Sequence, residues 1–85
     1  MTVSVMEQGW RIPALSPREI EVLTTWLRLD SKEEVGRQLY VAMGTINTHL
    51  LRIRAKYEMV GRPAPTKSAL LARALQDGFL DLGAL

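Results

Sequence analysis

The chain has 85 residues, and its eleven Lys and Arg residues nearly balance its nine Asp and Glu residues, which gives a net charge of +2 at pH 7. A chain of this length forms one domain with a small core. It contains no cysteine, which excludes disulfides, thiolate catalysis and a cysteine-ligated zinc ion. The sequence has neither a long apolar stretch nor a secretory signal, so we expect a cytoplasmic protein without a membrane segment, cofactor or metal.

Residues 1–14 show no helical period and contain Gly9 and Pro13, so they are predicted to be a linker or arm. Trp10 and Ile12 are large apolar side chains next to the start of the domain. We expect both to fold back onto it, because an aromatic residue beside a core usually packs against that core.

The first predicted helix has a clear beginning. Ser16 can cap it, Pro17 suits its first turn, and Glu19 completes a capping box three residues after the cap. The helix is predicted to run to about residue 28, with Trp26 half exposed on a flank. Its core stripe consists of Ile20, Leu23 and Leu27.

A second capping box, Ser31 with Glu34, predicts a short helix of about eight residues. Gly36 lies inside it, although glycine in a helix costs about 1 kcal/mol relative to alanine. We therefore expect another helix to approach closely at Gly36. The predicted buried positions of this helix are Val35 and Leu39.

Residues 43–58 are predicted to form the central helix, which follows a tight connection at residues 40–42. Its apolar positions are spaced by four, three and four residues, as in a stripe that packs onto a core; they are Ile46, Leu50, Ile53 and Tyr57. We expect Tyr57 to keep its hydroxyl at the surface. Two helices with so short a connection indicate a helix-turn-helix.

The other sides of residues 43–58 are polar and carry one acid, Glu58. Charge is unevenly distributed, because residues 15–38 hold four cations and five acids, whereas residues 44–67 hold five cations and one acid. A basic second half is the electrostatic footprint expected for binding phosphate. A solvated surface helix is the alternative interpretation of this pattern.

Pro63 and Pro65 place a loop after the central helix, and Thr66 can cap a fourth helix that Gly78 is placed to end. Residues 68–75 contain one charge, and adjacent residues such as Leu70 and Leu71 diverge by about 100° around a helix, so both cannot face one core. We therefore expect an apolar outer face that pairs two copies, and residues 81–85 to be a frayed tail. The predicted dimer interface consists of Ala69, Leu71, Ala72 and Leu75.

The stretches LSPREIEVL, SKEEVGRQLYV, GTINTHLLRIRAKY and ALLARALQDGFL resemble, in order and spacing, the LuxR-type helix-turn-helix domain of bacterial transcription regulators. The resemblance covers residues 15–80 and implies an all-α, four-helix domain without a wing. It also implies that the third helix enters the DNA major groove and that the fourth dimerises. Such domains usually form the C-terminal output of a response regulator or ligand-sensing regulator, which makes residues 1–14 a linker.

The chain departs from the family at Ala42, where a capping Ser or Thr is usual, at Asn47, where Lys is usual, and at Leu51, which is often polar or basic. Losing two cations is expected to lower nonspecific affinity, whereas Asn47 and Leu51 can read an adenine and a thymine methyl group. The resemblance and residue chemistry together predict base contacts from Asn47, Thr48, Leu51 and Arg52. Predicted phosphate contacts are Thr45, Arg54, Lys56 and Lys67. His49 is expected to be a packed residue with a satisfied ring nitrogen.

The predicted function is sequence-specific binding of double-stranded DNA by a homodimer, with RNA polymerase as a further candidate partner. Region four of sigma factors is an alternative, since it shares the capping boxes and the start of the central helix. A protein-interaction module is another alternative, because the basic face is weakened and the fourth helix is apolar. An enzyme is the weakest interpretation, because neither a carboxylate pair nor a nucleophile with a base is evident.

Overall fold

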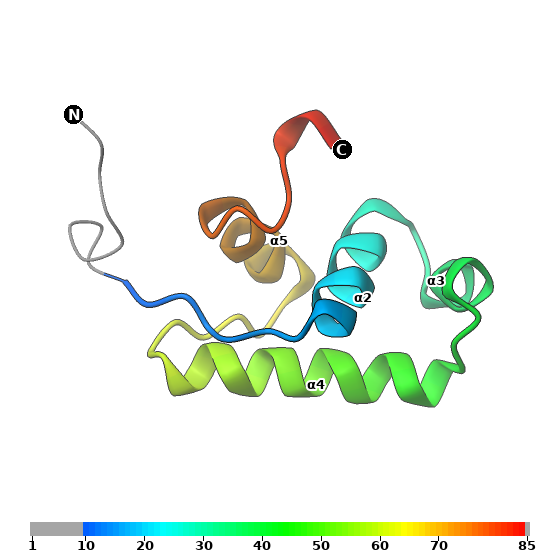
Figure 1. The fold of residues 1–85 in the computed structure, drawn as a ribbon, viewed down its shortest axis with the longest axis horizontal. Coiled ribbons are helices and arrows are strands. Elements are labelled where there is room, and N and C mark those ends of the chain that lie inside the picture. The colour runs from blue at the N-terminus through cyan, green and yellow to red at the C-terminus, as the bar shows by residue number, and fades with distance from the viewer. Residues whose placement is uncertain (1–9, 85) are drawn as a thin grey trace.

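The computed structural model describes residues 10–84, which form four α-helices and one short 3₁₀ helix. These are α2 (Pro17–Arg28), α3 (Lys32–Leu39), α4 (Met43–Met59), α5 (Lys67–Gln76) and the 3₁₀ helix η1 (Leu82–Ala84). Figure 1 shows α4 as a long rod, with α2 and α5 packed along one side of it and α3 at one end. The described residues contain no strand, so the predicted all-α, four-helix fold is confirmed.

Within residues 10–84, no helix combines the length and apolar character needed to cross a bilayer.

Side-chain caps begin three of these four α-helices. Ser16 Oγ accepts the Glu19 N–H at 3.1 Å, and Glu19 Oε1 accepts the Ser16 N–H at 2.8 Å, which completes the predicted capping box. Ser31 caps α3 and Thr66 caps α5. The prediction of a second capping box was wrong in one respect. Among the described residues, the Glu34 side chain accepts no hydrogen bond from the Ser31 N–H. Helix α4 begins at Ala42 without a side-chain cap, as its sequence predicts.

The stripe of α4 forms the centre of the core, as predicted, and side chains from the other three helices close around it. The largest fully buried side chains are Val22, Leu23, Val35, Ile46, Leu50, Ile53, Tyr57 and Leu70. The expectation of a half-exposed Trp26 was wrong, because only 7% of this residue is exposed. Cationic side chains from three other parts of the chain cover its ring, and this covering is invisible to the local helical pattern.

Gly36 faces both the backbone of the following turn and helix α4, where Ile46 Cδ1 would lie 3.6 Å from a Cβ atom at this position. A Cβ atom on Gly36 would lie 2.7 Å from the carbonyl oxygen of Val41. This is too close for a carbon atom, so only glycine, which has no Cβ, fits here without a shift. The N–H of Val41 in turn donates to Gly36 O at 3.0 Å. The expected close approach of another helix is therefore present, but the nearest group is a carbonyl oxygen of the turn, which was not predicted. Tyr40 completes the turn with a left-handed φ of 56° and an almost wholly exposed side chain.

A buried polar network joins the end of α4 to the end of α5. The Tyr57 hydroxyl donates to Asp77 Oδ2 at 2.7 Å, and Arg62 Nη2 donates to Asp77 Oδ1 at 2.8 Å. The expectation that the Tyr57 hydroxyl reaches the surface was wrong, because this residue is fully buried. Burial raises the pKa of the Tyr57 hydroxyl and the Asp77 hydrogen bond raises it further, so the group stays protonated as a donor.

The N-terminal segment is fastened to this network. Arg62 Nη1 donates to the carbonyl oxygen of Arg11 at 2.7 Å, and the Trp10 ring lies 5.2 Å from Arg62 Cζ. Trp10 is partly buried, as predicted, whereas Ile12 remains 39% exposed and does not fold back as expected. Part of the predicted linker is thus packed on the domain.

The C-terminal end of the described chain turns back over α5. Gly78 adopts a left-handed φ of 77° just beyond the end of α5, as its predicted role requires. Beyond Gly78, Leu80 is buried and Phe79 is partly buried and packs on the core. The prediction of a frayed tail was wrong for residues 82–84, because they form the 3₁₀ helix η1.

Candidate nucleic-acid interface

Helix α4 presents four longitudinal stripes, because positions spaced by four, three and four residues share one side of an α-helix. One stripe is the buried one described above. The outer face, opposite the core, contains Gly44, Thr48, Ala55 and Met59. One side, which we call the Trp26 flank, contains Asn47, Leu51, Arg54 and Glu58. The other side, which we call the Glu19 flank, contains Thr45, His49, Arg52 and Lys56.

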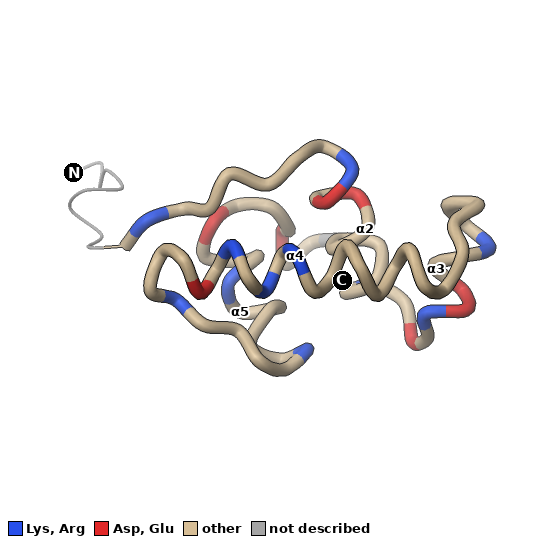
Figure 2. Tube along the Cα trace, turned by 90° about the horizontal axis from the view of Figure 1, so that it is seen from below, with Lys and Arg blue, Asp and Glu red and all other residues tan. Residues whose placement is uncertain are grey.

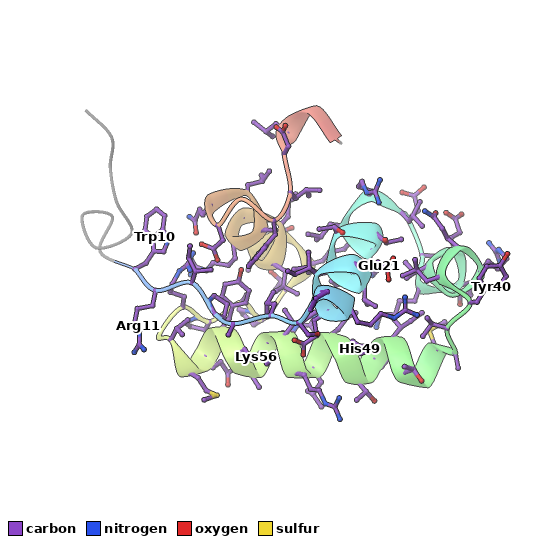
Figure 3. The ribbon with its side chains drawn as sticks, viewed as in Figure 1. Trp10, Arg11, Glu21, Tyr40, His49 and Lys56 are labelled. Carbon is purple, nitrogen blue, oxygen red and sulfur yellow. The ribbon has the colours of Figure 1, made fainter. Side chains whose placement is uncertain are left out.

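Different parts of the chain lie against these two flanks. Figure 2 looks onto the outer side of α4 and shows the N-terminal segment along one edge of the helix, with the loop leading to α5 along the opposite edge. Figure 3 labels His49 and Lys56, which belong to the flank that the N-terminal segment accompanies. Only the outer face and parts of both flanks are therefore open to a partner.

The structure places all four predicted base-contacting residues on this open surface. Asn47, Thr48 and Arg52 are exposed, and Leu51 is 68% exposed. Thr48 Oγ1 donates to Gly44 O at 2.9 Å, so in this state its hydroxyl is used within the helix. The four residues occupy three different stripes of α4.

On the Trp26 flank, Lys32 Nζ donates to Asn47 Oδ1 at 2.8 Å. Lysine has no acceptor, so this contact holds the amide of Asn47 with its oxygen towards α3 and leaves the NH₂ group available elsewhere. Sequence reasoning missed Lys32. The two residues are fifteen positions apart on different helices, and no local pattern links them.

The Trp26 flank also gathers cations around one indole ring. Lys67 Nζ lies 4.9 Å, Arg54 Cζ 5.8 Å and Lys32 Nζ 5.9 Å from the ring centroid of Trp26. Two of these residues, Arg54 and Lys67, were predicted as phosphate contacts from the sequence. Each is partly buried, and Lys67 Nζ also donates to Leu29 O at 3.0 Å.

On the Glu19 flank, one of the two cations, Lys56, is paired with an acid. Lys56 Nζ donates to Glu19 Oε1 at 2.6 Å and to Ala14 O at 3.0 Å. Burial is the largest single influence on the pKa of Glu19 and raises it, but the hydrogen bonds from Lys56 and Ser16 and the positive charge of Lys56 outweigh burial and lower the pKa below its ordinary value. The charge of Lys56, a predicted phosphate contact, is thus offset by a buried carboxylate.

Thr45 and Arg52 are exposed on the same flank, and His49 is partly buried there. The packed position of His49 agrees with the prediction. The prediction that a ring nitrogen of His49 is hydrogen-bonded was wrong for Nδ1, which is buried without a hydrogen-bond partner among the described residues.

The predicted dimer face on α5 is partly open. Leu70 and Ala74 point into the core and are fully buried, whereas Ala72 is exposed. Ala69, Leu71 and Leu75 are partly buried and pack at the edge of the core. The expected divergence of Leu70 from Leu71 is present in the structure.

The family model described as "Bacterial regulatory proteins, luxR family" matches residues 13–67. The matched region runs from the end of the N-terminal segment through α2, α3 and α4 to the first residue of α5. No curated protein and no solved structure gives a significant match.

Proposed function

Because this chain belongs to the luxR family of bacterial regulatory proteins, whose members bind DNA through a helix-turn-helix, we propose that α4 enters the major groove and reads a specific duplex sequence. One observation carries this proposal: α4 buries a single stripe and leaves three sides that hold one acid among several cations. An α-helix with its side chains is about 10–12 Å across, close to the width of the major groove, about 12 Å. The domain would serve as the output of a response regulator or a ligand-sensing regulator, with RNA polymerase as a candidate partner.

Base recognition is assigned to Asn47, Thr48, Leu51 and Arg52. Exposed Leu51 suits an apolar contact with a thymine methyl group. Asn47 can pair bidentately with adenine only if its Oδ1 is free to accept from adenine N6. Lys32 occupies one of the two lone pairs of that oxygen and holds it towards α3, so Asn47 presents mainly its NH₂ donors, which suit the acceptor edge of guanine.

Phosphate contacts are assigned to Thr45, Arg54, Lys56 and Lys67. These residues lie on both flanks and at the start of α5, so they would hold the duplex on either side of α4. Lys56 would contribute less than Arg54 or Lys67, because its charge is already paired with Glu19.

Selection of bound sequences from a random duplex library gives the preferred site and tests the proposal directly. On that site Asn47→Ala should cost about 1–3 kcal/mol, with little change on random duplex. Arg54→Ala should weaken binding to every sequence alike and lower the salt slope by about one. An equal loss for Asn47→Ala on both kinds of DNA would make Asn47 a positioning contact only. A wild-type domain that does not bind random duplex at low salt would favour the protein-interaction module.

We also propose that the domain dimerises through Ala69, Leu71, Ala72 and Leu75 of α5. The support is the partly open apolar face described above, together with exposed Ala72, a small residue that allows close approach of a second copy. Paired domains would place two α4 helices about 34 Å apart, one turn of DNA. Sedimentation at high concentration and titration on one half-site against two would test this. Monomers throughout, with no gain from the second half-site, would refute it.

A further inference from the structure

Three cations from three helices converge on one aromatic ring. Lys32 begins α3, Arg54 lies in the middle of α4, and Lys67 begins α5, yet all three cationic groups lie within 6 Å of the Trp26 ring centroid. The ring itself is 7% exposed and forms part of the core wall. We call Lys32, Arg54 and Lys67 the Trp26 cation cluster.

Within residues 10–84, none of these three cations forms an ion pair with an acid. The ion pairs found there join other residues, and the hydrogen bonds donated by the two lysines go to neutral oxygens, Asn47 Oδ1 and Leu29 O. Arg54 Nε is buried without a hydrogen-bond partner in the described chain. The face of an indole ring attracts cations by roughly 0.5–2 kcal/mol each, but it neither accepts their hydrogen bonds fully nor cancels their charge.

Such an arrangement lacks a negative ligand. Each lysine ammonium group has three donors and one of them is used in the contacts above, whereas a guanidinium group can donate two parallel bonds to one oxyanion. A phosphodiester group, with one negative charge and several acceptor oxygens, would accept from all three side chains and relieve their mutual repulsion.

We propose that the Trp26 cation cluster is a single binding site for one backbone phosphate of DNA, at the edge of the groove that α4 occupies. The proposal rests on the function proposed above. Lys32 connects this site to base reading, because the same ammonium group that faces Trp26 also holds Asn47 Oδ1. Capture of a phosphate by Lys32 would therefore change which hydrogen-bonding groups Asn47 presents to the bases.

The first test measures how duplex affinity depends on salt for Lys32→Gln, Lys67→Gln and the double variant. Each neutralised phosphate contributes about 0.9 to the slope, and the cluster is proposed to bind one phosphate, so the double variant should lose up to about 0.9 and bind roughly 8-fold more weakly at 0.1 M salt. Arg37→Gln is the matched control, since it removes the same charge from an exposed position in the last turn of α3. A slope unchanged in the double variant, or lowered per charge as much by Arg37→Gln, would overturn the proposal.

The second test uses Trp26 as a reporter. The chain has two tryptophans, so Trp10→Phe leaves Trp26 as the single indole. Duplex should change its emission, and Lys32→Gln with Lys67→Gln should remove most of that change. Inorganic phosphate at matched ionic strength is the comparison: a saturating response to it without DNA would reassign the site to free phosphate and overturn the backbone contact.

These outcomes separate the two proposals. If the wild-type domain does not bind duplex at low salt, the proposed function fails. If it binds duplex while Trp26 emission and the slopes of the variants stay unchanged, the function stands and the cluster is only a packing feature.

Discussion

The two flanks of α4 both carry cations, but they hold them in opposite ways. On the Glu19 flank, Lys56 meets a buried carboxylate that accepts its hydrogen bond and offsets its charge. On the Trp26 flank, Arg54 and two lysines meet a neutral ring that orients them without offsetting their charge. A count of basic residues along α4 gives two for the Glu19 flank, Arg52 and Lys56, and one for the Trp26 flank, Arg54. The structure neutralises Lys56 and adds two lysines from other helices to the Trp26 flank.

The difference shows how a small domain can fix a cation in position and still keep its charge available. A carboxylate partner gives the stronger bond but makes a neutral pair, and an aromatic partner gives a weaker attraction and leaves the full charge. The Glu19 flank therefore serves mainly the fold, because it ties α4 to the start of α2 and to the N-terminal segment. The Trp26 flank serves the fold through the ring and the proposed function through the cations.

The largest expected effect comes from removing the ring. Trp26→Ala should lower the free energy of unfolding by about 3–5 kcal/mol, because a buried aromatic side chain is replaced by a cavity. Denaturant titration followed by circular dichroism measures the loss. Trp26→Phe keeps a ring and is the control, with a smaller loss and a nearly unchanged salt slope on DNA. A loss below about 1 kcal/mol for the alanine variant would show that the ring is not part of the core.

Glu19→Gln should make the Glu19 flank resemble the Trp26 flank. The free energy of unfolding should fall by about 1–2 kcal/mol, because the ion pair with Lys56 is lost and the capping box is weakened. Lys56 would then keep its full charge, and the salt slope on DNA should rise by up to about 0.9. Parallel denaturation and binding titrations check both effects. A weakened fold with an unchanged slope would mean that Lys56 does not reach the duplex.

The same pair predicts a pH dependence. The pKa of Glu19 is lower in the folded state than its ordinary value of 4.5, so its contribution to stability is fully present above about pH 4.5 and is lost as the pH falls through the folded-state value. Denaturant titrations between pH 3 and pH 6 should show a steeper loss for wild type than for Glu19→Gln. Identical pH profiles would assign the acid sensitivity to other carboxylates.

The smallest effect concerns the contact between Lys32 and Asn47 on the Trp26 flank. Lys32→Met keeps the length of the side chain and frees Asn47 Oδ1, so adenine should gain about 1 kcal/mol, close to fivefold, over guanine at the position that Asn47 reads. Library selection with both proteins measures the change. Arg37→Met, which removes a cation from α3 without touching Asn47, should leave the base preference as it is.

Much of the fold was predictable because its signals are local. The Ser16 capping box, the Thr66 cap and the stripe of α4 each depend on residues within one or two helical turns, and the structure confirms all three. Gly36 correctly predicted a close approach, because glycine destabilises a helix interior and is expected there only where a side chain would not fit. The nearest group was missed because it is a carbonyl group of the following turn, whose path no periodicity describes.

The features that were missed depend on residues far apart in the sequence. Trp26 is buried by side chains from α3, α4 and α5, and the Tyr57 hydroxyl meets Asp77 twenty residues later. In the candidate site, the helix and its exposed residues could be predicted, because a helical period separates core from surface. The sequence could not show which cations are neutralised, because Lys56 and Glu19 are 37 residues apart and only the folded chain brings them together.

The buried guanidinium group of Arg62 has a consequence for the order of assembly. It joins the Arg11 carbonyl, 51 residues earlier, to Asp77, 15 residues later. A contact between such distant residues requires a large loss of chain entropy before it stabilises the fold. Such contacts are therefore expected to form after the helices that pack against neighbours closer in the sequence. The segment at Trp10 and Arg11 is therefore expected to dock last during folding and to detach first, opening a site for proteolysis while the helices remain intact.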